Sequence, residues 1–155
     1  MSLHIMTRFY EAFAAGDADA MADLYHPEIS FEDPVFGKLD GARVMAMWRM
    51  LIERSKGTLQ IRFENARIEG DVGRLRWIAT YPFSKTGRLV VNRIEAEMRF
   101  RDGRIVAHRD RFSFWRWSRQ ALGLPGWVLG RTPLLRKKVS AEALKGLAMW
   151  EKRRG

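Results

Sequence analysis

The sequence predicts an α+β fold, a cone-shaped curved antiparallel sheet covered by three N-terminal helices, with a helical, basic C-terminal extension. Three observations support this. Apolar residues recur every three or four positions up to about residue 55. The period changes to two from about residue 59 to residue 116, and becomes helical again in the tail. We expect a domain over residues 1–116 and the extension over residues 117–155.

The first third of the chain contains three helical patterns with clear breaks between them. Ala15-Gly16-Asp17 ends the first helix and opens the second. His26-Pro27 ends the second, because the residue before a proline disfavours helical backbone. A glycine, Gly41, precedes the third. The patterns predict helices over 3–15 and 18–25, a short strand at 29–31, and a helix over about 42–55.

The middle of the chain alternates between apolar and polar residues, as strands of a half-buried sheet do. The first predicted strand bends near Glu64-Asn65, and Arg101-Asp102-Gly103 is a tight hairpin signal. Charges of both signs alternate on the outer face of the strand over 88–101, which indicates cross-strand ion pairs or a dimer surface. The predicted strands are 59–68, 73–83, 88–101 and 104–116.

The remaining residues are helical in pattern. Residues 117–122 end at Gly123, and Pro125-Gly126 breaks the chain. A final helix is expected from Ser140, as its N-cap, to residues 152–154. Its expected apolar stripe consists of Leu144, Leu147 and Ala148.

Composition narrows the class of protein. The chain has 155 residues and no cysteine, which excludes disulfides, thiolate metal sites and a cysteine nucleophile. No apolar run is long enough to span a bilayer, and no secretory signal is visible at the start, so we expect a soluble cytoplasmic protein. The isolated His4 and His26 do not suggest a metal site.

The positive charge is concentrated in the tail. The formal net charge is +10, and residues 116–155 hold ten Lys or Arg against two acids. Such a tail suits an anionic membrane surface, nucleic acid or an acidic partner, or it is a solvated helix face. The aromatic residues that accompany it lie in the segment from Phe112 to Trp117 and at Trp127 and Trp150. We expect them first to close the open end of the cone or the dimer seam, then to contact a membrane, and last to bind nucleic acid.

Several motifs of the chain occur together in one known superfamily. They are Arg8-Phe9-Tyr10, Ala15-Gly16-Asp17, Leu24-Tyr25, Phe31-Glu32-Asp33-Pro34-Val35 and the run Phe100 to Phe112. The first four look like the first half of ketosteroid isomerase, and the last resembles the final hairpin of SnoaL-like polyketide cyclases and limonene epoxide hydrolase. All are nuclear transport factor 2-like proteins, and the resemblance covers about residues 5–116.

The resemblance implies a candidate base but not the rest of either active site. Asp33 stands where ketosteroid isomerase carries its general base; the alternative is a turn residue that accepts backbone N–H groups. The oxyanion donors of the isomerase align with Phe9 and Ala96. Tyr10 is adjacent to Phe9, but a helix turns it about 100° away, so we expect it to be a poor substitute. The acid that the epoxide enzyme carries on an earlier strand is also missing, because the matching region, 76–81, has no Asp.

A second group lies on the last predicted strand. His108 and Asp110 are two residues apart and face the same way, and the resemblance turns that face inward. They form either a hydrogen-bonded core pair or an acid/base pair. In the second case Asp33 abstracts a proton, and His108, oriented by Asp110, supplies one. The expected walls of the substrate site are Phe9, Phe13, Trp48, Trp77, Tyr81 and Phe112.

The predicted function is therefore cofactor-free acid/base chemistry on a small hydrophobic carbonyl or epoxide compound, as in an isomerase, cyclase or hydratase/hydrolase. The alternatives are a non-catalytic module that binds a small ligand, and a membrane-surface or partner-binding protein that uses the basic tail. We also expect a homodimer formed through the sheet. Binding of nucleic acid ranks last among the partners.

Overall fold

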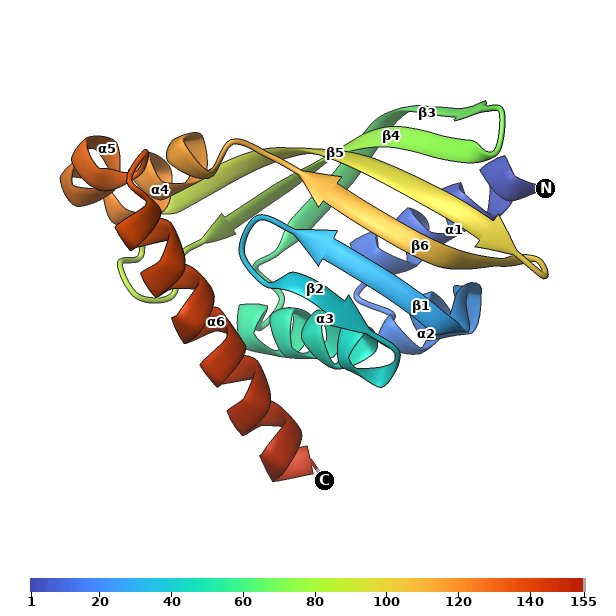
Figure 1. The fold of residues 1–155 in the computed structure, drawn as a ribbon, viewed down its shortest axis with the longest axis horizontal. Helices are drawn as coiled ribbons and strands as arrows, with labels where there is room; N and C mark the ends of the chain where they lie inside the picture. The colour runs from blue at the N-terminus through green and yellow to red at the C-terminus, as the bar shows by residue number, and fades with distance from the viewer. Residues whose placement is uncertain (155) are drawn as a thin grey trace.

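A curved six-stranded sheet organises the chain in the computed structural model, which describes residues 1–154 (Figure 1). Helices α1–α3 lie against one side of the sheet, and helices α4–α6 lie at one end of it. The elements are α1 (Ser2–Ala14), α2 (Ala18–Leu24), β1 (Tyr25–Asp33), β2 (Gly37–Asp40), α3 (Ala42–Ser55), β3 (Gln60–Glu69), β4 (Val72–Pro82), β5 (Leu89–Arg101), β6 (Arg104–Arg111), α4 (Phe114–Leu122), α5 (Leu124–Leu129) and α6 (Pro133–Arg154).

The predicted fold class is confirmed, with one refinement in the sheet. The strand order is β2-β1-β6-β5-β4-β3, and all neighbours are antiparallel except β1 and β6, which run parallel. The sheet is therefore mixed rather than wholly antiparallel. The pairing of β1 with β6 brings the end of the first strand beside the last one, and this placement builds the site described below.

The helices α1 and α3 have the predicted extents to within one residue. The second helix is one residue shorter than predicted, because Tyr25 already has extended backbone and begins β1. Asp17 caps α2 by accepting a hydrogen bond from the N–H of Ala20 at 3.0 Å. The short strand β2 was not predicted, since four residues carry too little alternation to be recognised.

The sheet has the predicted bend in β3 and the predicted tight turn between β5 and β6, where Asp102 and Gly103 both have a positive φ. Pairing between β3 and β4 shifts register between Glu64 and Arg67, and Asn65 has a φ of 57°, which is a bulge where the bend was expected. On the outer face, Arg74 pairs with Glu97 at 2.9 Å and Arg76 with Glu95 at 2.7 Å. The alternating charges on β5 therefore form cross-strand ion pairs.

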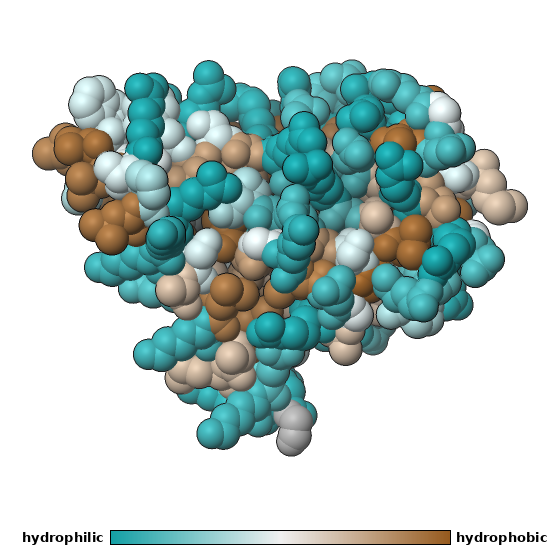
Figure 2. Space-filling view, viewed as in Figure 1, coloured by the Kyte–Doolittle hydropathy of each residue, from teal (hydrophilic) through white to brown (hydrophobic). Residues whose placement is uncertain are grey.

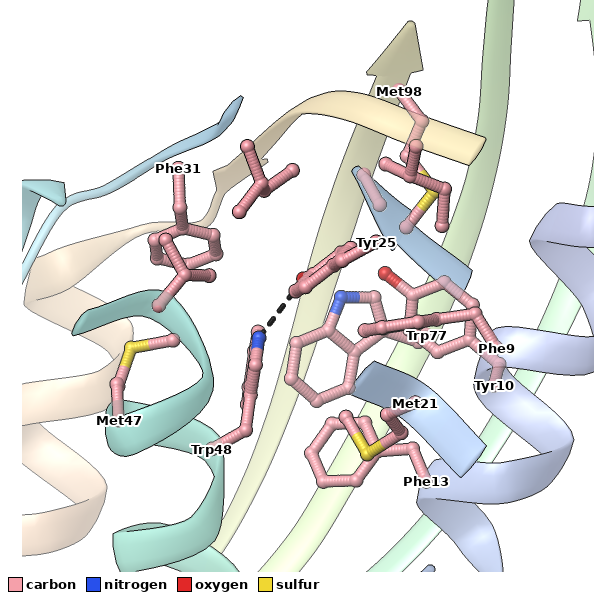
Figure 3. Close-up of a cluster of buried hydrophobic side chains, with 14 of the residues drawn as sticks. Phe9, Tyr10, Phe13, Met21, Tyr25, Phe31, Met47, Trp48, Trp77 and Met98 are labelled. Atoms are coloured by element: carbon pink, nitrogen blue, oxygen red, sulfur yellow. Dashed lines mark hydrogen bonds between the residues drawn. The ribbon is translucent and has the colours of Figure 1, made fainter. Parts of the chain in front are cut away.

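Most of the buried apolar side chains form one large cluster between the sheet and the helices α1–α3, and it is rich in aromatic rings (Figure 3). A second, smaller cluster lies under α4. It consists of Val90, Phe114, Trp117 and Ala121. Three half-buried side chains contact both clusters, and these are Val35, Tyr81 and Phe112. The helix α4 thus covers the open end of the cone with Phe114 and Trp117, as expected, whereas Trp127 is exposed and does not help to close it.

Three predictions for the last part of the chain are wrong. The break expected at Pro125-Gly126 lies inside the short helix α5, because proline is tolerated in the first turn of a helix. The last strand ends at Arg111 rather than 116, because the Ser113 hydroxyl accepts the N–H of Arg116 and caps α4. The final helix begins at Pro133, and Thr132 caps it by accepting the N–H of Leu135 at 3.3 Å. Thr132 followed by Pro133 is a signal for the start of a helix, and α6 begins there instead of at Ser140.

Helix α6 runs back over the domain and packs on α3 (Figure 1). Leu144 and Leu147 face inward as predicted, whereas Ala148 is exposed. Instead of capping a helix, Ser140 donates a hydrogen bond to the carbonyl of Val35. Among residues 1–154, no helix combines the length and the apolar character needed to cross a membrane.

Helices α4 and α5 meet at a very close backbone approach. A Cβ added at Gly126 would overlap the carbonyl of Ser118. We expect Gly126→Ala to lower the free energy of unfolding by about 1–3 kcal/mol, because backbone cannot move aside as a side chain can. Urea denaturation measures this. The control is Gly146→Ala in α6, where the new methyl meets only the flexible end of Arg54, and it should be neutral or stabilising. Equal effects of the two variants would contradict the prediction.

Candidate functional site

His108 lies at the centre of the cone, on the inner face of β6. Its side chain is fully buried, and both ring nitrogens have partners within the protein. Nδ1 is 2.7 Å from the hydroxyl of Tyr25. Nε2 is 2.9 Å from Oδ1 of Asp110 and 3.2 Å from the hydroxyl of Tyr10. No nitrogen of this imidazole is left for a ligand.

Two tryptophans extend the network to either side. The indole N–H of Trp48 donates to the Tyr25 hydroxyl at 2.9 Å, the bond drawn in Figure 3. The indole N–H of Trp77 donates to Oδ1 of Asp110 at 3.3 Å. The ring of Trp48 also stacks on His108, with centroids 5.9 Å apart. Five side chains around one imidazole make a satisfied polar network inside an apolar core, an arrangement that fixes a unique packing.

Burial strongly affects the acidity of the two phenols. The pKa of Tyr10 and that of Tyr25 both lie well above the usual tyrosine value, first because burial disfavours the phenolate and further because Asp110 is negatively charged. Both hydroxyls therefore keep their protons at any physiological pH. They act in this network as neutral hydrogen-bonding groups.

Asp33 lies at the end of β1, near Asp110. The parallel register of β1 and β6 places Phe31 next to His108 and ends with Glu32 next to Arg109, one residue before the two acids. Since side chains alternate along a strand, both carboxyl groups belong to the inner face. They are near enough for the negative charge of Asp110 to raise the pKa of Asp33.

The environment of Asp33 combines the two interpretations made from the sequence. Its Oδ1 accepts the N–H groups of Val35 at 2.9 Å and Phe36 at 2.6 Å, as a turn residue would. Burial nevertheless raises the pKa of Asp33 to about 7, against the opposing effect of the Phe36 N–H, and the negative charge of Asp110 adds to the rise. The side chain is half-buried, so solvent can reach it.

Three residues on the inner face carry a polar group that has no hydrogen-bond partner among residues 1–154. These groups are Oδ2 of Asp33, Oδ2 of Asp110 and the side-chain amide of Asn92. Every side-chain N or O atom that is fully shielded within residues 1–154 has a hydrogen-bond partner, so all three groups must touch space that water can enter.

The predicted walls divide into two groups. Phe9, Phe13, Trp48 and Trp77 are at most 5% exposed and pack on one another, so they fill the cone instead of lining a cavity. Tyr81 and Phe112 are half-buried at the open end, where the indole N–H of Trp117 in α4 donates to the Tyr81 hydroxyl at 2.8 Å.

The sequence analysis missed three members of the site. Tyr10 was expected to be a poor substitute for the oxyanion donor at position 9, yet its hydroxyl reaches His108, because α1 packs with both Phe9 and Tyr10 fully buried. Tyr25 was expected to face inward from the second helix, but it begins β1 and its contact with His108 was not predicted. Asn92 was not singled out at all, although a polar residue on the inner side of an alternating strand is a signal that could have found it.

Comparison with known proteins supports the resemblance read from the sequence. The family model of the SnoaL-like domain matches residues 6–108, which is more than half of the chain. No curated protein matches the chain.

Among solved structures, IdmH from Streptomyces antibioticus, a proposed polyketide cyclase, is 21% identical; the match covers 76% of this chain and 95% of IdmH, with a TM-score of 0.64. A protein from Catenulispora acidiphila with a ketosteroid isomerase-like fold, in complex with trimethylamine, is 17% identical over 79% of this chain and 94% of its own, with a TM-score of 0.63. TerC, co-crystallised with polyporic acid, is 15% identical over 70% and 88%, with a TM-score of 0.61.

At these identities the solved structures show the fold alone, which is the ketosteroid isomerase-like cone. The match to the family model covers α1–α3 and most of the sheet, and it ends at His108, within the network. The chain belongs to the family of SnoaL-like domain proteins.

Proposed function

We propose that this protein catalyses proton transfer on a small hydrophobic carbonyl compound, with Asp33 as the acid/base group. The observation that carries the proposal is the placement of Asp33 on the inner face, near Asp110, at a half-buried position. Burial, with a further contribution from the negative charge of Asp110, raises the pKa of Asp33 to about 7, and such a carboxyl can accept and return a proton near neutral pH.

The other residues have supporting parts in this proposal. The free Oδ2 of Asp110 is the second group that can face a substrate. His108 is a positioning residue, because its two ring nitrogens are taken up by Tyr25, Asp110 and Tyr10. This differs from the role of proton donor that was expected from the sequence. Tyr81, Phe112 and Val35 supply apolar surface beside the two acids.

The class of substrate follows from these surroundings and from the neighbouring structures. A flat apolar carbonyl compound would contact the rings of Tyr81 and Phe112 and place an acidic C–H near Asp33. TerC was co-crystallised with polyporic acid, and IdmH is described as a proposed polyketide cyclase. The proposed chemistry needs no cofactor, since a carboxylate base suffices for proton abstraction next to a carbonyl.

Deuterium exchange tests the proposal. In D2O at neutral pD, the protein should accelerate exchange of the α-protons of 2-tetralone, followed by proton NMR. We expect Asp33→Asn to lower the accelerated rate roughly hundredfold, because an amide cannot take the proton. The matched control is Glu32→Gln, which removes the neighbouring carboxylate on the outer face and should leave the rate unchanged. A wild-type rate equal to that of buffer would contradict the proposal.

One observation favours a second candidate function, non-catalytic binding of a small ligand. Aromatic side chains occupy most of the cone, so little room is left around His108. If 2-tetralone raises the melting temperature of the protein without any accelerated exchange, the binding module is the better description. The homodimer through the sheet and the cytoplasmic location stay predictions.

A further inference from the structure

The most unusual surface of the molecule is the end formed by α5 and the residues next to it. Figure 2 shows apolar side chains gathered at the end of the molecule where Figure 1 places α5. Ten large apolar side chains are exposed among residues 1–154, and six of them belong to this end. We call these six the apolar tip: Leu89, Leu124, Trp127, Val128, Leu129 and Leu134.

The segments that form and flank the apolar tip carry positive charge that no ion pair offsets among residues 1–154. Residues 113–141 contain six Lys or Arg and no Asp or Glu. Within the part of the chain that the structure describes, none of these six forms an ion pair, whereas Arg74, Arg76 and Arg109 on the sheet all do. The six are Arg116, Arg119, Arg131, Arg136, Lys137 and Lys138.

A shallow hollow joins the apolar and the basic groups. It has a volume of about 940 Å³ and is open to solvent, and Arg88 and Arg119 line it together with Leu89, Leu124 and Trp127. Each of these guanidinium groups is held in place. Arg88 donates to the carbonyl of Gln120 at 2.9 Å, and Arg119 lies 4.7 Å from the centre of the Trp115 ring.

The tip is also held rigidly on the domain. The indole N–H of Trp115 donates to the carbonyl of Trp127 at 3.0 Å, and the Ser118 hydroxyl is 3.2 Å from the carbonyl of Gly126. These contacts fix α5 with its large side chains facing outward. Exposed leucine and tryptophan on a fixed support indicate a surface built for contact, because a small domain seldom exposes so many large apolar groups together.

We propose that the apolar tip docks on an anionic lipid bilayer, with its side chains in the interfacial layer and the six cations over lipid headgroups. Leucine, valine and tryptophan beside lysine and arginine are the composition of interfacial anchors. The hollow between Arg88 and Arg119 would receive one phosphate. Nucleic acid would account for the cations but not for exposed Leu124, Val128 and Leu134, since aliphatic side chains neither stack on bases nor pair with phosphate.

Vesicle flotation tests this with the full chain. We use phosphatidylcholine vesicles with 30% phosphatidylserine, pure phosphatidylcholine vesicles, and a DNA duplex of random sequence in place of lipid. The protein should float with the anionic vesicles at 50 mM NaCl, and binding should fall at least tenfold with pure phosphatidylcholine or at 500 mM NaCl. Absence of binding to anionic vesicles, or DNA binding that anionic vesicles cannot compete away, would overturn the proposal.

Two pairs of variants separate the tip from general effects. Leu124→Ser with Val128→Ser, and separately Lys137→Glu with Lys138→Glu, should each weaken binding to anionic vesicles about tenfold or more. The controls are Ile68→Ser, an exposed apolar residue of β3, and Lys152→Glu with Arg153→Glu at the far end of α6. Both controls should bind within threefold of wild type. A control that loses as much as its matched variant would show that surface charge or folding, not the tip, governs binding.

Discussion

Replacement of His108 by alanine is expected to lower the free energy of unfolding by about 3–5 kcal/mol. The variant removes a buried ring that packs against Phe31 and Trp48. It also leaves the hydroxyl of Tyr25 and the carboxylate of Asp110 each short of a partner. A buried carboxylate without its partner is among the most costly defects in a core. Urea denaturation at pH 7 measures the change.

The matched control is Arg109→Ala on the outer face of the same strand. Its guanidinium is half-exposed and pairs with Glu32 at 3.2 Å, so its loss should change stability by less than about 1 kcal/mol. His108→Gln separates packing from hydrogen bonding, because its amide can still donate to Asp110 and should recover part of the loss. If His108→Ala unfolds at the same urea concentration as wild type, the buried network does not stabilise the fold.

The second large effect concerns Asp33 and pH. The pKa of Asp33 is raised from 3.8 to about 7 in the folded protein. Below pH 4 its carboxyl is protonated in both states and contributes no difference. Between about pH 4 and pH 7 this carboxyl is ionised in the unfolded chain but still mostly protonated in the folded protein. Its contribution therefore lowers the free energy of unfolding further with each pH unit in this range, and above pH 7 the contribution is constant. The total is at most about 4 kcal/mol.

Asp33→Asn should therefore stabilise the protein at pH 8 by up to about 4 kcal/mol and change little at pH 4. The amide oxygen can still accept the N–H groups of Val35 and Phe36, so the turn is kept. Urea denaturation of both proteins from pH 4 to pH 8 isolates this carboxyl, because all other titrating groups are shared. Together with lost proton transfer, a gain in stability would mark Asp33 as a group kept for function.

The outer-face variant Glu32→Gln provides the reference for this experiment. Glu32 lies next to Asp33 in sequence and pairs with Arg109 and Lys38 at the surface. Its difference from wild type should not grow between pH 4 and pH 8 as that of Asp33→Asn does. A flat difference for Asp33→Asn as well would mean that Asp33 ionises in the folded protein as it does in water.

Much of the fold could be read from local patterns. The helix over 42–55, the bend at Glu64-Asn65 and the hairpin at Asp102-Gly103 all depend on residues close in sequence, and all are found as predicted. Sequence alone fails where two local signals compete. Thr132-Pro133 and Ser140 could each begin the last helix, and only the packing of Ser140 against Val35 shows which does not.

The candidate site likewise has some features that were predicted from the sequence and others that depend on how the elements pack. Alternation along a strand and resemblance to a family predicted, from the sequence, that Asp33, His108 and Asp110 share one inner face. The parallel pairing of β1 with β6, which brings Asp33 near Asp110, and the contacts of His108 with Tyr10 and Tyr25 are seen in the folded structure alone. Contacts between residues that are far apart in the chain depend on how whole elements pack, and no local pattern encodes that packing.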